Sequence, residues 1–327
     1  MSHAQTECWV ISDGAAGNER QAIALAERLG VTIRVWRISP CAPWSWLAPR
    51  LTFAARWSMP AVTRLAFDAP WPALAIGCGR DAALYTRCLR RWSKGFTFTV
   101  QILDPRIAPR HFDLVVAPQH DGLRGTNVLT PLGSLNPIDA EWLAQAAEAS
   151  SELADLPQPR TAVLIGASRG ALQIDESWCD ALVATLRRRH MRDGGSFLVT
   201  TSRRTPDTLA ARLRDGFAAF PGRFWSGSQD GPNPYAGFLA QSQAIVVSPD
   251  SVNMLSEACA VGVPVYTLLQ NIATSKLALL HRALMDAGQL RLLDAPTDSE
   301  TPAPPALRET AAIADDVRRR WLLHNSR

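Results

Sequence analysis

The sequence predicts an α/β protein built from two parallel, doubly wound sheets, and three observations carry this prediction. Short apolar runs suited to buried strands alternate with helical patterns over most of the chain. The alternation lapses once, between residues 137 and 160, where Ala, Glu, Ser and Pro dominate. The length of 327 residues also suggests about two domains. We therefore expect an N-terminal domain over residues 1–145 and a C-terminal domain over residues 146–327.

The composition argues against several classes of function. A net charge of +4 is too mild for a nucleic-acid-binding footprint, so no nucleic-acid partner is expected. The six cysteines include no Cys-x-x-Cys pair, and the six histidines show no metal-ligand spacing. Core thiols in a reducing compartment and the absence of a metal site are therefore expected. With neither a signal-peptide pattern nor an apolar run long enough to span a bilayer, we expect a cytoplasmic protein.

The N-terminal half supplies the elements of the first sheet. The expected strands are residues 8–12, 31–38, 73–76, 96–103, 113–117 and 127–132. A helix over residues 18–29 has one apolar face, and another ends at Trp92. Because ligands gather outside the carboxyl ends of parallel strands, the residues that follow these strands are candidate site residues. Four of them should share that edge: Asp13, Gly77, Asp104 and His120.

The turn after the third expected strand supports an alternative function. Residues 77–82 fit the pattern Gly-x-Gly-x-x-Ala, a variant of the dinucleotide fingerprint. This pattern would suit an NAD(P)-dependent enzyme, and the resemblance described below would then imply one that modifies nucleotide-sugars. However, it does not open the first strand–helix–strand unit, and the candidate acid Asp104 lies beyond the end of the next strand.

Residues 39–72 are rich in Trp, Arg and Pro, and two interpretations stay open. A basic, Trp-rich amphipathic segment can lie on an anionic membrane surface, which would place the protein at the periphery of the inner membrane. Alternatively, the segment is a helical excursion whose aromatic side chains pack onto the N-terminal sheet. The second interpretation is favoured, because aromatic side chains usually belong to a core.

The C-terminal half repeats the alternation of strands and helices. The expected strands are residues 161–165, 196–201, 224–225 and 244–247, with another that begins at residue 265. The expected helices are residues 175–192, 272–287 and 307–324, with another that ends at Gly262.

Residues 244–266 read as strand, turn, helix and strand. Asp250 or Ser251 can cap the helix, whose first N–H groups suit a phosphate. Asn253 adds a small polar group there. Glu257, about one turn further, could accept two hydrogen bonds from a ribose diol, or could be an ordinary solvated carboxylate.

Other candidate residues for binding a phosphate-containing ligand follow the strands of the same half. Arg169, in a glycine-rich turn, could pair with a diphosphate or could be an ordinary exposed arginine. The remaining candidates lie at a strand's carboxyl end or at a helix start, and they are Ser168, Ser202, Arg203, Asn233 and Tyr235.

The pattern Asp-Ser-x-x-Met-x-Ser-Glu-Ala-x-x-x-Gly-x-Pro-Val, from Asp250 to Val265, resembles the donor-nucleotide segment of GT-B glycosyltransferases. Over roughly residues 8–270 the chain also resembles bacterial relatives of the mitochondrial fission "elongated mitochondria" (ELM) family. The stretches that carry this resemblance are residues 9–22, 101–106, 112–121, 200–206 and 233–239.

The resemblance implies two Rossmann-like domains that face each other across a cleft. The first would hold an acceptor and the second a nucleotide-diphosphate sugar, with the C-terminal helix returning to the first domain. The implied reaction is glycosyl transfer without a cofactor or metal, because arginines and a helix dipole can neutralise the leaving diphosphate. Glu257 would then hold the ribose, and Ser251, Ser168 and Arg169 the diphosphate.

Asp13 is the candidate general base on the acceptor side, and His120 is the rival, since imidazole titrates nearer neutral pH. Asp13 could instead merely cap the helix that follows. The other acceptor-side candidates are Gly14, Gly17, Asn18, Gly77, Gly79, Arg80 and Asp104. The competing class of function is a non-catalytic scaffold, because plant members of the family resemble adaptors that act in mitochondrial division through a dynamin-like partner.

Overall fold

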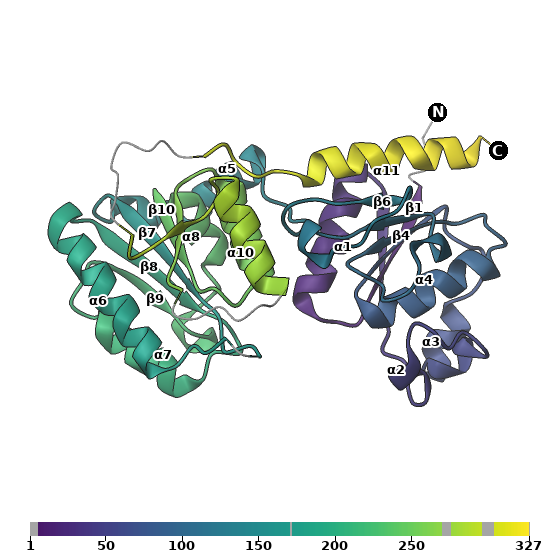
Figure 1. The fold of residues 1–327 in the computed structure, drawn as a ribbon, viewed down its shortest axis with the longest axis horizontal. Helices are drawn as coiled ribbons and strands as arrows, with labels where there is room; N and C mark the ends of the chain where they lie inside the picture. The colour runs from purple at the N-terminus through teal and green to yellow at the C-terminus, as the bar shows by residue number, and fades with distance from the viewer. Residues whose placement is uncertain (1–5, 171, 270–275, 296–303, 327) are drawn as a thin grey trace. The chain divides into compact units, whose positions relative to one another are not determined.

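The computed structural model describes residues 6–170, 172–269, 276–295 and 304–326. The chain forms two compact units, the first made of residues up to Pro137 and from Glu309 onward, the second of Ile138–Arg308. Each contains a six-stranded parallel sheet covered by helices (Figure 1), which confirms the predicted α/β class. The expected domain boundary after residue 145 falls within helix α5 (Ala140–Glu148), which belongs to the second unit.

The sheet of unit 1 has the strand order β2-β1-β3-β4-β5-β6. Its strands are β1 Glu7–Ser12, β2 Thr32–Arg37, β3 Leu74–Cys78, β4 Phe98–Ile102, β5 Leu114–Val116 and β6 Val128–Leu129. Its helices are α1 Ala16–Leu29, α2 Trp44–Leu47, α3 Ala61–Ala66, α4 Arg80–Trp92 and α11 Thr310–Asn325. Its 3₁₀ helices are η1 Ala55–Ser58, η2 Pro109–His111 and η3 Gln119–Asp121.

Alternation of side chains along β1 distributes the core of unit 1 over both faces of the sheet. Cys8 and Val10 pack with α1 and with the C-terminal helix α11, which lies against α1 (Figure 1). Trp9 and Ile11 pack on the opposite face, with α4 and the Trp-rich segment. The carboxylate of Glu309 fixes the start of α11, because it accepts hydrogen bonds from the backbone N–H groups of Leu132 and Gly133 at 2.8 and 3.0 Å.

The sheet of unit 2 has the strand order β12-β11-β10-β7-β8-β9. Its strands are β7 Arg160–Ile165, β8 Ser196–Thr201, β9 Gly222–Trp225, β10 Ala244–Val247, β11 Val265–Thr267 and β12 Arg291–Leu292. Besides α5, its helices are α6 Glu176–Asp193, α7 Asp207–Phe217, α8 Tyr235–Gln241, α9 Val252–Val261 and α10 Lys276–Asp286. Its 3₁₀ helices are η4 Ser151–Asp155 and η5 Ser228–Asp230. The predicted start of α10 at residue 272 lies outside the described residues, as does most of the Pro-rich stretch 294–306.

Each sheet has a point at which the strand order reverses, and such a point is where open α/β sheets bind ligands. In unit 1 it lies between β1 and β3, because the chain leaves β1 for β2 and then returns to β3 on the other side. In unit 2 it lies between β7 and β10 for the same reason.

The Trp-rich segment is divided between an inner and an outer part. The ring centroid of Phe67 lies 4.7 Å from that of Trp9 on β1 and 5.0 Å from that of Trp36 on β2, so the inner aromatic side chains form part of the core as favoured. The outer part does not fit that interpretation, because its large apolar side chains are exposed. Among the described helices, none is both long and apolar enough to cross a membrane.

His281 on α10 is a buried histidine whose titration should weaken unit 2 in acid. Burial lowers the pKa of its imidazole from 6.5 to about 4, although the backbone of Pro249 opposes the shift. Above pH 6.5 the ring is neutral in both the folded and the unfolded chain. Between pH 6.5 and 4 only the unfolded chain takes up the proton, so the free energy of unfolding falls as the pH falls.

We therefore expect the wild-type protein to lose about 2 kcal/mol more stability than a His281→Leu variant between pH 7 and pH 5. Urea denaturation of both proteins at the two pH values measures the difference. Equal losses in the two proteins would show that His281 does not contribute to acid sensitivity.

Candidate functional site

A buried carboxylate lies at the reversal point of unit 2. Asp250 follows β10 and is fully buried. Its Oδ1 accepts a hydrogen bond from the Ser248 hydroxyl at 2.6 Å, and its Oδ2 accepts one from the Ala167 N–H at 3.1 Å. The Ser248 hydroxyl oxygen also accepts a hydrogen bond from the Gly166 N–H at 2.7 Å. Asp250 therefore ties the turn after β10 to the turn after β7, and it shapes the site instead of presenting its carboxylate to solvent.

Gly166 is required by this close approach. A Cβ at position 166 would overlap both carboxylate oxygens of Asp250. The turn after β8 joins the same cluster, because the Thr205 hydroxyl donates to the Gly166 carbonyl at 2.6 Å. The Arg204 guanidinium lies 3.6 Å from the Asp250 carboxylate and is itself mostly exposed. The reversal point of unit 2 thus combines a tight glycine turn with an exposed cation.

Helix α9 begins beside this cluster. Ser251, not Asp250, is its N-cap, because the Ser251 hydroxyl accepts a hydrogen bond from the Met254 N–H at 3.3 Å. Asn253 lies in the first turn and is partly buried. The end of a helix at which N–H groups point outward carries partial positive charge, so it suits an anion.

Glu257 lies further along α9 and is 4% exposed. Its carboxylate accepts a hydrogen bond of 2.6 Å from the Tyr235 hydroxyl. The Asn233 side-chain oxygen in turn accepts a hydrogen bond from the Tyr235 N–H at 3.0 Å, at the start of α8. Hydrogen bonds therefore connect three of the residues that were predicted to bind the nucleotide-sugar. A ribose diol that bound Glu257 would share this carboxylate with the Tyr235 phenol.

The remaining residues that were predicted to bind the nucleotide-sugar lie on the turns after β7 and β8. The Ser168 hydroxyl donates to the Ile174 carbonyl at 3.1 Å and accepts from the Ile174 N–H at 2.9 Å, so it closes its own loop. Arg169 and Arg203 are exposed. The Ser202 hydroxyl accepts a hydrogen bond from the Arg204 N–H at 3.2 Å. These serines therefore stabilise the turns that present the arginines.

A second cluster lies at the reversal point of unit 1. The half-buried Asp13 follows β1, and its Oδ1 accepts a hydrogen bond from the Ala15 N–H at 2.9 Å. The Asn18 side-chain amide lies 3.3 and 3.4 Å from the two carboxylate oxygens. Gly79, with φ of +90°, closes the other side, because a Cβ there would lie 2.7 Å from the Asn18 amide nitrogen. Asp13 is not the cap of α1, whose N-cap is Ala15 without a side-chain hydrogen bond.

Gln101, which the sequence did not single out as a site residue, holds the turn at Gly79 in this cluster. It is fully buried on β4, and its amide group donates to the carbonyls of Gly79 and Ile102 at 3.1 and 2.9 Å. The available signal was an amide side chain in the β-rich run 96–103. A Cβ at Gly77 would overlap the Thr86 hydroxyl, so packing of α4 on β3 accounts for that glycine without a dinucleotide. Burial raises the pKa of the neighbouring Cys78 thiol, and the charge of Asp13 adds to the shift, which keeps the thiol neutral.

The other acceptor-side candidates diverge from this cluster. The Arg80 guanidinium turns away to the Ser45 carbonyl of α2, to which it donates at 2.7 Å. Asp104, after β4, accepts from the Arg106 N–H at 2.8 Å and closes its own turn. His120 lies in η3, after β5, which is two strands further from the reversal point than β3. Gly14 has φ of +85°, and Gly17 lies in the first turn of α1.

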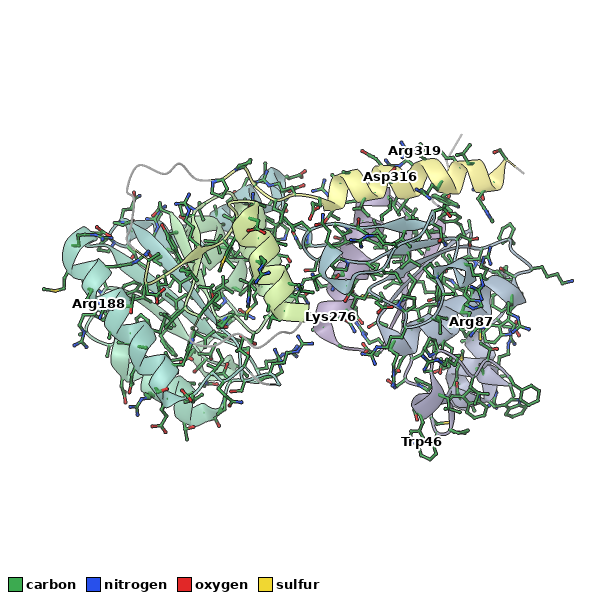
Figure 2. The ribbon with its side chains drawn as sticks, in the orientation of Figure 1. Trp46, Arg87, Arg188, Lys276, Asp316 and Arg319 are labelled. Carbon is green, nitrogen blue, oxygen red and sulfur yellow. The ribbon has the colours of Figure 1, made fainter. Side chains whose placement is uncertain are left out.

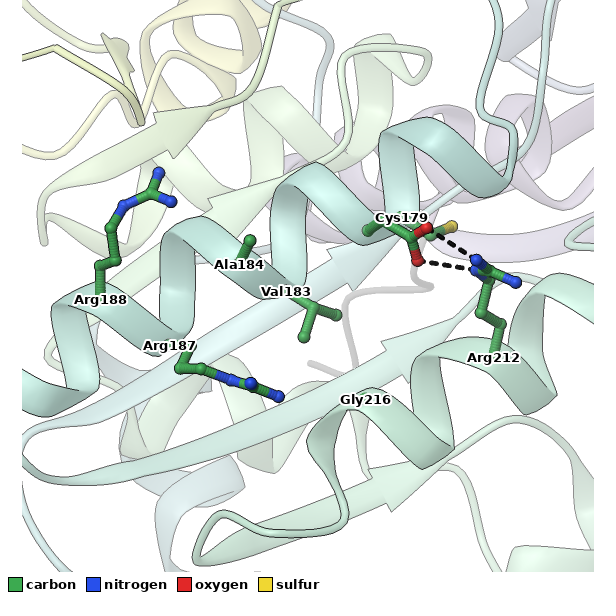
Figure 3. A pocket seen from close by; sticks show the side chains of 8 residues that line it. Cys179, Val183, Ala184, Arg187, Arg188, Arg212 and Gly216 are labelled. Carbon is green, nitrogen blue, oxygen red and sulfur yellow. Dashed lines mark hydrogen bonds and ion pairs between the residues drawn. The ribbon is translucent and has the colours of Figure 1, made fainter.

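A groove between α6 and α7 carries no predicted site residue (Figure 3). Arg212 on its wall is paired with Asp180 at 2.7 Å and with Glu176 at 3.1 Å. The residues that line the groove are Cys179, Asp180, Val183, Ala184, Arg187, Arg188, Arg212 and Gly216.

A family model and a curated relative both identify the same family for this chain. Residues 16–321 match the family described as Mitochondrial fission ELM1. The mitochondrial fission protein ELM1 of Arabidopsis thaliana is 31% identical over 284 residues, which cover 79% of this chain and 66% of that protein. An uncharacterized protein of Rickettsia prowazekii is 26% identical over 296 residues, 79% of this chain and 82% of that one. The chain thus spans just under two thirds of the Arabidopsis relative.

Solved structures share the fold at low sequence identity. A putative UDP-N-acetylglucosamine 2-epimerase from Listeria monocytogenes matches with a TM-score of 0.56 and 12% identity, over 98% of this chain and 90% of that one. The UDP-GlcNAc 2-epimerase of Methanocaldococcus jannaschii, in complex with UDP-GlcNAc and UDP, matches with a TM-score of 0.52 and 11% identity, over 96% and 99%. These likenesses confirm the expected GT-B-like fold.

The contact between Gly166 and Asp250 can be tested by a double-mutant cycle. We expect Gly166→Ala to lower the free energy of unfolding by about 1–3 kcal/mol, because the added methyl group overlaps the buried carboxylate. The same substitution should cost clearly less on an Asp250→Ala background, where the overlap is gone. Urea denaturation of the four proteins gives both values, and strictly additive effects would contradict the contact.

Proposed function

This chain belongs to the mitochondrial fission ELM1 family, and we propose that it is a GT-B-like glycosyltransferase that uses a nucleotide-diphosphate sugar. The reversal point of unit 2 carries the proposal, because a tight glycine turn, exposed arginines and a helix N-terminus meet there. These are the groups that bind a diphosphate. The solved epimerase in complex with UDP-GlcNAc and UDP shows that a protein of this fold binds such nucleotides.

Three parts of unit 2 would bind different parts of the nucleotide-sugar. The turn after β7, held by Asp250, would let the diphosphate approach the backbone closely, since no side chain intervenes at Gly166. The N-terminus of α9 and the guanidinium groups of Arg169, Arg203 and Arg204 would neutralise the charge that develops on the leaving diphosphate. Glu257 would hold the ribose through its carboxylate, oriented by Tyr235.

Asp13 is the proposed general base for an acceptor hydroxyl bound by unit 1. The hydroxyl oxygen would form a bond to the anomeric carbon as the bond from that carbon to the diphosphate oxygen breaks. The hydroxyl proton would pass to the Asp13 carboxylate, and the electron pair of the broken bond would leave with the diphosphate. Asn18 would orient the carboxylate, and His120 is the rival base.

A non-catalytic scaffold is the second candidate, and two observations favour it. The family is described by mitochondrial fission and not by a chemical reaction. The Glu257 carboxylate is also nearly buried and already hydrogen-bonded to Tyr235, an arrangement that can serve the fold alone. Binding of a nucleotide-sugar separates the two candidates.

One nucleotide-sugar, among UDP-, GDP-, ADP- and CMP-sugars, is expected to raise the melting temperature. Ligand at one hundred times its dissociation constant should add about 2.7 kcal/mol of stability. Glu257→Gln should weaken that binding roughly tenfold or more, because the neutral amide is a poorer acceptor for the ribose diol. Calorimetric titration of both proteins measures the loss.

Two further variants serve as controls for this titration. Tyr235→Phe keeps the carboxylate and should bind at least as well as Glu257→Gln, whereas Glu176→Gln removes an exposed carboxylate on α6 and should change nothing. If no nucleotide binds at millimolar concentration to the wild-type protein, the scaffold candidate replaces the transferase.

Asp13→Asn should abolish most of the transfer while leaving the donor site intact. Asparagine can still accept the hydrogen bond from the Ala15 N–H but cannot accept the hydroxyl proton. We expect transfer to fall by a factor on the order of a hundred or more, with nucleotide-sugar affinity and melting temperature near those of the wild type. Undiminished transfer would remove Asp13 from the mechanism and direct attention to His120.

A further inference from the structure

Unit 1 carries a set of large apolar side chains that face outward from α2, η1, α3 and the loops between them. Phe53 is 84% exposed, Trp46 76% and Trp57 65%. Figure 2 shows Trp46 at the outer end of the unit, on the side away from the sheet. We name this set the outer surface, and its members are Trp46, Leu47, Phe53, Trp57, Val62 and Leu65. Six exposed large apolar side chains on residues 46–65 of one segment indicate a binding surface.

The outer surface is not needed to hold its own segment in place. Arginines on α4 do this by donating to the segment's oxygen atoms. Arg80 reaches the Ser45 carbonyl at 2.7 Å, Arg87 the Pro49 carbonyl at 3.1 Å, and Arg91 the Thr52 hydroxyl at 3.2 Å. Because these bonds and the inner aromatic side chains fix the segment, packing within the unit does not explain the exposed side chains.

The segment carries a net positive charge. Between residues 39 and 72 the only charged residues are Arg50, Arg56, Arg64 and Asp68. Arg56 and Asp68 pair at 2.9 Å, which leaves Arg50 and Arg64 as the net charge. Arg64 stands over the ring of Trp57, 4.2 Å from its centroid, so a cation and an exposed indole are presented together.

We propose that the outer surface docks unit 1 onto an anionic lipid bilayer. The Trp and Phe rings would enter the boundary between headgroups and acyl chains, where amphipathic rings are favoured. Arg50 and Arg64 would meet the lipid phosphates. A fluid lipid surface suits side chains that project separately from short helices, whereas a protein partner would need a complementary pocket for each of them.

Vesicle sedimentation tests the proposal with the full chain. The protein should bind vesicles of phosphatidylcholine with phosphatidylglycerol more tightly than pure phosphatidylcholine, and high salt should weaken the binding. Trp46→Ser with Trp57→Ser should reduce the partition coefficient about tenfold or more, because two indoles no longer leave water. Arg50→Gln with Arg64→Gln should remove most of the preference for anionic lipid.

The matched control is Leu322→Ser with Leu323→Ser, which removes two exposed apolar side chains from α11 of the same unit. This variant should bind vesicles as the wild type does. Absence of vesicle binding by a folded protein would overturn the proposal. So would an equal loss in the control, or self-association in sedimentation equilibrium that the Trp46 and Trp57 substitutions abolish.

Discussion

The buried carboxylate of Asp250 is the constraint on which the candidate donor site depends. A buried charge is tolerated only when its hydrogen bonds are made, and here they come from Ser248 and from the backbone of Ala167. Making them requires the turns after β7 and β10 to lie against each other, with glycine at position 166. The start of α9 is fixed by the same contact, and with it the direction in which the helix N-terminus points.

The cluster in unit 1 resembles this arrangement in topology, but its aspartate is less buried and makes longer hydrogen bonds. Both lie where the strand order reverses, and both join an aspartate to a glycine turn across that point. Asp250 is fully buried with a bond of 2.6 Å, whereas Asp13 is half-buried and its bonds to Asn18 are 3.3 and 3.4 Å long. The Asp250 carboxylate is enclosed by the turns that it holds together, whereas the partly exposed Asp13 carboxylate can be reached by an acceptor hydroxyl. The two aspartates therefore suit different roles.

Local sequence patterns predicted most of the strands and helices, whereas the roles of individual residues depend on tertiary contacts. Alternation of apolar runs located every strand except β12, and polar residues after the strands marked the carboxyl edges of the two sheets. The part played by Asp250 could not be predicted, because it depends on β7 pairing with β10, which lies far away in sequence. The predicted division after residue 145 lies inside α5, and α5 contacts α8 of unit 2, where the Gln241 side-chain amide donates to the Ala147 carbonyl. Composition also could not separate inner from outer tryptophans, since that depends on which side of each short helix meets the sheet.

Arg80 links the two proposals that concern unit 1. Its backbone begins α4 directly after Gly79, which closes the cluster around Asp13, and its guanidinium holds the carbonyl of Ser45 beside Trp46. The single side chain of Arg80 therefore connects the reversal point of unit 1 with the outer surface. A membrane contact at the outer surface and an acceptor held beside Asp13 would therefore belong to the same unit, and the side chain of Arg80, which already fixes α2, lies between them.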